Sequence, residues 1–528
     1  MAIAVLVHGV RPVTNGPGQA VTEPTVSTAP AIAAGASESA DQLSPSVRPA
    51  LFSLVLAQFL CSFAGTSTNV AITPIATDLG VSVQVVQAAI TLFTLTMAAL
   101  MIPGSKLSDI LGRKRCFAIG LIVYGAGALT AAAAVGPGMF VLGYSIGQGV
   151  GTSLLIPPVY IFGTVLVTGT VARARVFGAI SAAAGIGSAA GPLIGGTITS
   201  LTSWRVTFVV QALIVVAVLL LGRRLVDAHE RSSARGFDVL GAVLSALGLV
   251  LLVVGILLTG TYGWGVSVSG TTPVGMLELA PGSLSPVWPL VVVGFVFLGI
   301  FLRHLRAVER AGGTPLLATR ILRNRVSNLG LVTQNAQWLI LQGLAFVVSV
   351  FVQTVRGLGP IETGLVLTPA TVGILGASLA APRMARRRPQ AVLVRAGFAV
   401  TIVGITLLVL LASPTSSFAS FIPGLLLIGV GIGVMLTASV NIVQSSFPED
   451  DQGEISGLSR AVSNLGSSLG VAIAGSIVVS SAFSGAQGYG YALLVLGVVG
   501  VIGLVAALLL PSRRPDAAGP SVGAIGSA

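Results

Sequence analysis

The sequence has little charge for its length. Of its 528 residues, only 8% are Asp, Glu, Lys or Arg, whereas a soluble globular domain carries about 25%. Hydrophobic residues make up 54% of the chain, and the mean hydropathy is +0.97. Such a chain cannot cover itself with side chains that bind water, so a soluble globular protein and a disordered chain are both excluded for most of its length.

Residues that bind metals, form disulfides or catalyse reactions are also scarce. The chain has 2 Cys and 3 His. Cys61 lies in an apolar run and Cys116 beside a basic loop, so we expect no disulfide, and no His or Cys spacing fits zinc. The Gly-x-Ser-x-Gly sequence at 143–147 lies inside an apolar run, where no nucleophile elbow forms. Neither Lys106 nor Lys114 stands in a phosphate-binding sequence. We therefore expect no metal, no cofactor and no enzymatic activity.

Long apolar runs dominate the rest of the sequence. We count fourteen, each near the ~20 residues that a membrane-spanning helix needs. An outer-membrane barrel would show short alternating strands instead, so the predicted fold class is an all-α membrane protein. The predicted spans are 50–73, 83–103, 116–136, 139–163, 176–200, 205–222, 238–260, 286–303, 328–353, 362–382, 392–412, 418–444, 456–482 and 489–511.

The basic residues fall in alternate loops between these spans. All but two of the 28 Lys and Arg residues lie on one side of the arrangement, and Arg205 and Arg356 lie on the other. Cytoplasmic loops of membrane proteins carry an excess of Lys and Arg, so both termini are predicted to be cytoplasmic. The same rule accounts for the net charge of +12, and we expect no binding of nucleic acid.

The spans group into two sets of six around a central pair. We predict a disordered cytoplasmic tail at 1–48, a six-helix bundle at 49–223, a linker and helix pair at 224–310, a second six-helix bundle at 311–511, and a cytoplasmic tail at 512–528.

The loop after the second span reads Gly104-Ser-Lys-Leu-Ser-Asp109-Ile-Leu-Gly112-Arg113-Lys114. Glycine allows the tight turn between two spans. Asp109 and Arg113 are four residues apart, and we expect them to pair on one helical face. The alternative is a solvent-exposed hairpin whose basic residues only reflect the excess of Lys and Arg in cytoplasmic loops.

The fifth span is rich in small residues. Glycines four apart let helices approach closely, and a proline bends the helix. These residues either form a packing seam alone or shape a moving helix. They are Gly187, Gly191, Pro192, Gly195 and Gly196.

These two elements resemble signatures of the major facilitator superfamily. The loop is similar to G-x-x-x-D-[RK]-x-G-R-[RK], and the fifth span is similar to the G-P-x-x-G-G element of the family's drug antiporters. Trp204-Arg205-x-x-Phe208 and Phe237-Asp238-x-x-Gly241 extend the match over about 50–511. The resemblance to the fourteen-span drug:proton antiporters implies two six-helix bundles, a central pair, and rocking of the halves about a midplane site. It also implies that the loop is a latch between the halves.

The acid and arginine that usually serve proton coupling in these antiporters are missing. Gly65 and Thr66 stand where an acid of the first span is expected, and Ser145 stands where an arginine of the fourth is expected. None of the 16 acids lies in the middle of a span, although coupling needs a buried titratable group. The resemblance implies coupling to protons, whereas the absence of these residues argues against it. The candidates that are left to carry a proton are Asp109 and Asp238, each at the end of a span.

The polar residues inside the spans are mostly neutral amides, which are costly in lipid and should face the interior. Three residues of the ninth span share one face at helical spacing. Amides and an indole could bind a ligand of mixed polarity, although each amide could instead only bridge helices. The candidate cavity residues are Asn69, Gln148, Gln334, Trp338 and Gln342.

Arg460 opens the thirteenth span and has two interpretations. It is either an arginine that reaches the membrane surface, where Asp450, Asp451 and Glu454 supply partners, or a buried charge that replaces the one missing from the fourth span.

The function expected from these features is secondary active export of small amphipathic molecules from the cytoplasm across the inner membrane. The resemblance implies coupling to protons, and we expect the protein to be a monomer. One alternative is a uniporter or importer of a neutral metabolite, which the missing acid favours. The other is a membrane sensor that transports nothing.

Overall fold

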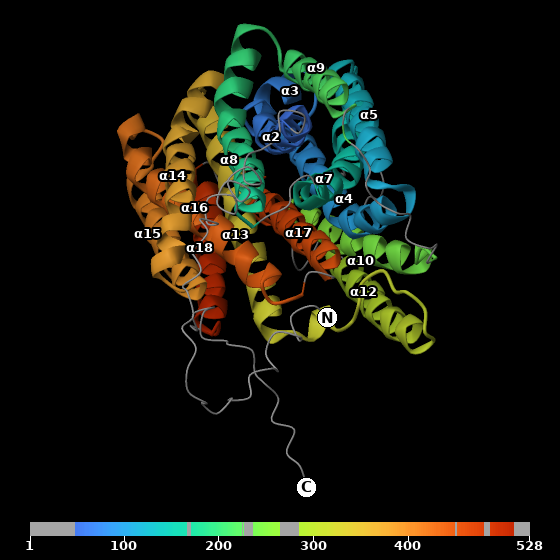
Figure 1. The fold of residues 1–528 in the computed structure, drawn as a ribbon. Helices are drawn as coiled ribbons and strands as arrows, with labels where there is room; N and C mark the ends of the chain where they lie inside the picture. The colour runs from blue at the N-terminus through green and yellow to red at the C-terminus, as the bar shows by residue number, and fades with distance from the viewer. Residues whose placement is uncertain are drawn as a thin grey trace, which may run out of the picture. The chain divides into compact units, whose positions relative to one another are not determined.

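The computed structural model of the chain is drawn in Figure 1. It describes residues 48–165, 170–223, 225, 236–263, 285–448, 451–479 and 486–511. Residues 1–47 of the predicted disordered tail, the predicted tail at 512–528, the loop at 264–284 and Asp450 lie outside the described residues, whereas Arg48 belongs to a helix.

Long α-helices occupy every predicted span, which confirms the all-α fold. Thirteen helical segments of the described chain are long and apolar enough to cross a membrane, and α8, at the fifth predicted span, is a further helix of 32 residues. The long helices are α2 (Arg48–Val70), α4 (Val83–Leu111), α5 (Arg113–Ala132), α7 (Gly149–Val165), α8 (Thr170–Leu201), α9 (Trp204–Gly222), α10 (Val239–Leu257), α12 (Val287–Arg310), α13 (Arg325–Val350), α14 (Pro360–Arg387), α15 (Gln390–Leu411), α16 (Ile422–Gln444), α17 (Gln452–Val479) and α18 (Gln487–Leu508).

Short elements join or extend some of these helices. The fourth span starts with α6 (Pro137–Phe140) and continues through the π-helix η1 (Val141–Gln148) into α7. A second π-helix, η3 (Phe351–Val355), extends α13. The remaining short elements are α3 (Ile72–Asp78), α11 (Thr259–Tyr262), η2 (Ile321–Arg323) and η4 (Phe418–Phe421).

The helices form two six-helix bundles. In the first, α2 packs on α8, and α5 packs on α7 and α9. In the second, α16 packs on α14 and α15, and α13 packs on α17 and α18. The bundles meet along two main contacts, α4 with α17 and α8 with α14. Figure 1 shows α8 beside α14, although they belong to different halves of the sequence.

The central pair lies against one of these contacts. Helix α10 packs on α12 and also contacts α4 and α17. Leu95, Val253 and Ala472 form a small buried apolar cluster where α4, α10 and α17 meet. Helix α12 exposes large apolar side chains such as Phe295 (61% exposed), which suits contact with lipid. The pair therefore covers the seam between the bundles from one side.

The two ends of the helices differ in charge. We call the end that holds Lys106, near the end of α4, the basic end, and the end that holds Asp78, before α4 begins, the opposite end. Arg320 pairs with Asp451 at the basic end. Arg205 pairs with Asp78 at the opposite end, in agreement with the separation expected from the sequence.

Candidate functional site

The glycines of the fifth span bring α8 close to α2. Gly187, Gly191 and Gly195 all face α2. A methyl group at Gly187 would lie 2.5 Å from the carbonyl oxygen of Phe59, and one at Gly191 would overlap the hydroxyl of Thr66. Only glycine permits this approach, because heavier side chains would push the helices apart. These three glycines therefore serve helix packing within the first bundle.

The last glycine of the element faces the other bundle. A methyl group at Gly196 would lie 2.5 Å from the carbonyl oxygen of Pro360, at the start of α14. The contact is reciprocal, since a methyl group at Gly364 would lie 2.5 Å from the carbonyl oxygen of Pro192. The backbones of α8 and α14 therefore touch near the opposite end and close the bundles against each other there.

Neutral amides form a second contact between the bundles. The Nε2 atom of Gln342 donates to the carbonyl oxygen of Gly65 (3.3 Å). Gln353 donates to the carbonyl oxygen of Asn69 (3.3 Å) and accepts from the backbone N–H of Thr73 (3.0 Å). Two side chains of the second bundle thus bind backbone groups of α2 and α3. Gln353 was not predicted as a site residue, and its only signal was an amide at the end of an apolar run.

Asn69 enters this contact through its backbone carbonyl, and its side chain is 1% exposed. Its Oδ1 and Nδ2 atoms have no hydrogen-bond partner among the described residues. A buried amide without partners loses about 1–3 kcal/mol relative to a satisfied one. A ligand with one donor and one acceptor would recover this energy, so Asn69 stays a candidate binding residue.

The other predicted cavity residues do not share one site. Gln334 is buried and accepts from the hydroxyl of Ser459 at 2.9 Å, which joins α13 to α17. Trp338 is partly buried. Gln334 thus matches the alternative in which an amide bridges helices, whereas Gln342 bridges the two bundles.

Gln148 lies inside the first bundle. Its Nε2 atom donates to Oε1 of Gln211 at 2.9 Å, and the hydroxyl of Tyr124 donates to the same oxygen at 2.8 Å. All three side chains are fully buried, and they join η1, α9 and α5. This places Gln148 with a different set of helices from Gln342 and Gln353.

The basic loop differs from its predicted geometry. Helix α4 ends at Leu111, Gly112 has a φ of +95°, and α5 begins at Arg113. Asp109 and Arg113 therefore lie on two helices, and the expectation that they share one helical face was wrong. A chain reversal at Gly112 needs the left-handed conformation that favours glycine. Lys114 donates to the carbonyl oxygen of Arg223 (3.1 Å).

The remaining glycine of this loop sequence packs inside the first bundle. A methyl group at Gly104 would overlap the carbonyl oxygen of Ser153 on α7. Close approach of α4 and α7 thus accounts for this position.

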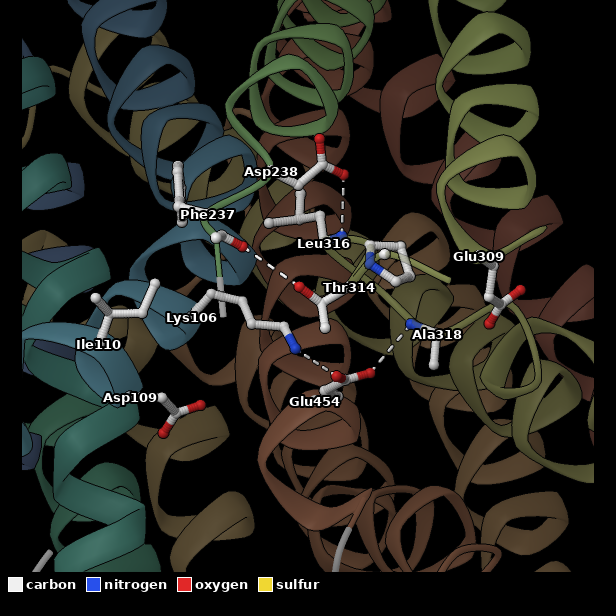
Figure 2. Close-up of a pocket in the computed structure, with 13 residues that line it drawn as sticks. Lys106, Asp109, Ile110, Phe237, Asp238, Glu309, Thr314, Leu316, Ala318 and Glu454 are labelled. Atoms are coloured by element: carbon white, nitrogen blue, oxygen red, sulfur yellow. Dashed lines mark hydrogen bonds and ion pairs between the residues drawn. The ribbon is translucent and has the colours of Figure 1, made fainter. Parts of the chain in front are cut away.

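An ion pair between the bundles adjoins the loop. Nζ of Lys106 on α4 lies 2.5 Å from Oε1 of Glu454 on α17. The other carboxylate oxygen of Glu454 accepts from the backbone N–H of Ala318 at 3.1 Å. Figure 2 shows Lys106 and Ala318 converging on Glu454 from different segments. The pair was not predicted, because nothing in the sequence relates two residues so far apart.

A cavity of about 250 Å³ lies beside this ion pair. Helices α4 and α17, the start of α10, and the segment between α12 and α13 all contribute to its wall (Figure 2). Its charged lining residues are Lys106, Asp109, Asp238, Glu309 and Glu454. The cavity thus joins the predicted latch loop to the central pair.

Asp238 fixes the central pair at this end. It caps α10 by accepting from the N–H of Gly241 (2.8 Å), accepts from the N–H of Leu316 (3.1 Å), and lies 2.8 Å from Nε2 of His304. Burial alone would raise the pKa of this carboxyl, but the hydrogen bonds from His304, Gly241 and Leu316 outweigh it, so the pKa lies below its ordinary value.

Arg460 lies between the bundles. Its guanidinium donates to the hydroxyl of Tyr160 on α7, and its central carbon is 4.5 Å from the centroid of the tyrosine ring. Of the acids expected to accompany it, Asp451 pairs with Arg320 and Glu454 pairs with Lys106. The described structure therefore favours a partly buried charge between the bundles over an arginine paired at the surface.

Comparisons with known proteins agree with this architecture. Residues 54–471 match the family model described as the Major Facilitator Superfamily. The chain is 29% identical over 487 residues to the puromycin resistance protein pur8 of Streptomyces alboniger, covering 88% of this chain and 91% of the relative. It is 28% identical over 441 residues to the multidrug efflux pump LfrA of Mycolicibacterium smegmatis, covering 81% and 80%.

A solved structure shows the same fold. The crystal structure of the human organic anion transporter MFSD10 (TETRAN) aligns with a TM-score of 0.56 at 15% identity, covering 88% of this chain and 99% of that one. At this identity the likeness concerns the fold alone.

The chain belongs to the major facilitator superfamily. It is a multi-pass membrane protein and a secondary transporter whose substrate is a small molecule, related to drug and antibiotic efflux proteins. This membership confirms the prediction that the chain is not an enzyme.

Proposed function

We propose that this protein exports small amphipathic organic molecules across the cytoplasmic membrane by alternating access. The observation that carries the proposal is the neutral amide contact between the bundles, where Asn69 is buried without hydrogen-bond partners. The resistance and efflux roles named for its relatives support the direction of transport.

The amide contact is suited to repeated opening. Gln342 and Gln353 bind backbone groups of the first bundle with neutral hydrogen bonds. Each contributes about 1 kcal/mol net, because water or a ligand can replace the partner. Opening the seam therefore costs little, and a substrate that satisfies Asn69, Gln342 and Gln353 compensates for the contacts it breaks.

The basic end is proposed to face the cytoplasm, with both termini on that side, because Lys and Arg accumulate on cytoplasmic loops. The gate at this end comprises the Lys106–Glu454 ion pair and the loop with Gly104, Asp109, Gly112, Arg113 and Lys114. At the opposite end, the gate is the contact of Gly196 and Gly364 with the facing backbone.

Proton coupling is proposed from kinship with efflux pumps, and the protein is taken as a monomer. Asp109 and Asp238, which both line the cavity beside the gate, are candidates to carry the proton. The alternative is a uniporter or importer of a neutral metabolite, which the neutral amide contact favours. Proteoliposomes with an imposed pH gradient separate the two, since flux that ignores the gradient would exclude antiport.

Export is tested by accumulation of a panel of fluorescent drugs in cells with and without the protein. We expect lower accumulation of at least one compound on expression, and loss of that effect in Asn69→Leu. The matched control is Asn441→Leu on α16, because Asn441 is exposed. Equal accumulation of every compound would refute export and favour a sensor that transports nothing.

A further inference from the structure

Arg460 is a cation at the interface between the bundles that has no acidic partner in the described chain. Its polar contact there is the hydroxyl of Tyr160, and its guanidinium also lies over the tyrosine ring. A charged side chain inside the membrane is costly and is a functional candidate unless it is paired. The tyrosine is neutral, so it does not compensate the charge.

The position of Arg460 lies deeper than the proposed gate. It is eight residues after the start of α17, or about 12 Å along the helix axis, whereas Glu454 is in the first turn. Tyr160 lies on α7 of the first bundle. A ligand bound here would therefore contact both bundles on the far side of the Lys106–Glu454 ion pair from the basic end.

Of the carboxylates near the start of α17, the two that the structure describes are already engaged. Glu454 binds Lys106 and the N–H of Ala318, and Asp451 binds Arg320. The local charge thus balances for those residues and leaves one positive charge on Arg460. Arg460 is partly buried. An uncompensated charge in such a place is unfavourable, and an anion that enters the site reduces the penalty.

The chemistry of the guanidinium defines the ligand. It has five N–H donors, and its fork binds the two oxygens of a carboxylate or sulfonate at once. The ring of Tyr160 covers one face and its hydroxyl accepts from one N–H group. The other N–H groups are left for the anion, with an aromatic surface beside them.

We propose that Arg460 binds an anionic group of the transported molecule, so that the substrates are organic anions with an apolar body. This inference rests on the proposed transport function and names its substrate class. It adds a single fixed positive charge to the neutral amides of the proposed function.

The test uses two ligands that differ in charge. The binding of 1-naphthalenesulfonate and of the neutral 1-naphthalenesulfonamide is measured by titration calorimetry on the purified full chain. We expect the sulfonate to bind at least about tenfold tighter, as charge-assisted hydrogen bonds do. Arg460→Gln should abolish this preference, and Arg460→Lys should retain part of it.

A charge-matched control is Arg383→Gln, which removes an exposed arginine at the end of α14 and should leave the preference unchanged. Equal affinity of the two ligands for the unaltered protein would overturn the proposal, as would a preference that persists in Arg460→Gln. If that variant does not fold, the ligand pair on the unaltered protein and Arg460→Lys still decide.

The outcomes distinguish this inference from the proposed function. Export of neutral dyes without any preference for the sulfonate would refute the anion site and leave export standing. Binding of the sulfonate at Arg460 without export of any compound would refute export and leave the site standing.

Discussion

The contact of α8 with α14 provides a sharp prediction through Gly364→Ala. The added methyl group would lie 2.5 Å from the carbonyl oxygen of Pro192, about 1 Å closer than an ordinary contact between non-bonded atoms. The overlap is with backbone, so the helices must separate. Overpacking of this kind costs about 1–3 kcal/mol.

The cost applies to the state in which the bundles touch at the opposite end, since α8 and α14 belong to different bundles. An energy of this size shifts the balance of two states by roughly 5- to 150-fold. We therefore expect Gly364→Ala to favour the state that is open at this end and to slow the transport cycle.

Disulfide cross-linking measures this shift. The hydroxyl of Ser200 accepts from the N–H of Ile361 at 3.1 Å, so Ser200→Cys with Ile361→Cys reports closure in a background without Cys61 and Cys116. We expect the cross-linking yield to fall in Gly364→Ala. The control is Gly376→Ala on the same helix, where a methyl group meets no atom within 4 Å. Equal yields in both variants would refute the reasoning.

Two further predictions concern the basic end. The effects of Lys106→Gln and Glu454→Gln on the free energy of unfolding should be non-additive, because the pair joins α4 to α17. A double-mutant cycle should give a coupling of about 1 kcal/mol. Additive effects would contradict a direct interaction. Asp238 has a pKa below its ordinary value of 3.8, so its stabilisation is present above that value and is lost as the pH falls through the folded pKa. The unfolding midpoint of the unaltered protein should therefore fall on acidification, and the gap between this midpoint and that of Asp238→Asn should narrow. A gap that stays constant down to pH 3 would show that the carboxylate does not stabilise the fold.

The sequence predicted the helices well, because each span is a continuous apolar run that must satisfy its backbone hydrogen bonds internally. The close packing at Gly187 and Gly191 was also foreseeable, since small residues at helical spacing mark a helix contact.

The sequence could not show which interior surface a polar side chain faces. Gln148 and Gln342 are both amides in apolar helices, yet one lies inside a bundle and the other between bundles. The pairing of Arg460 with Tyr160 depends on how α17 lies against α7, which local pattern does not encode. The separation of Asp109 from Arg113 arose because the helix breaks at Gly112.

The central claim, that the two bundles open alternately at their ends, is tested most directly by distances between spin labels. One pair at Ser200 and Ile361 reports the opposite end, and another at Arg115 on α5 and Arg383 on α14 reports the basic end. The account predicts that a bound substrate or a change of pH lengthens one distance while it shortens the other. Two distances that stay constant, or that change in the same direction, would contradict it.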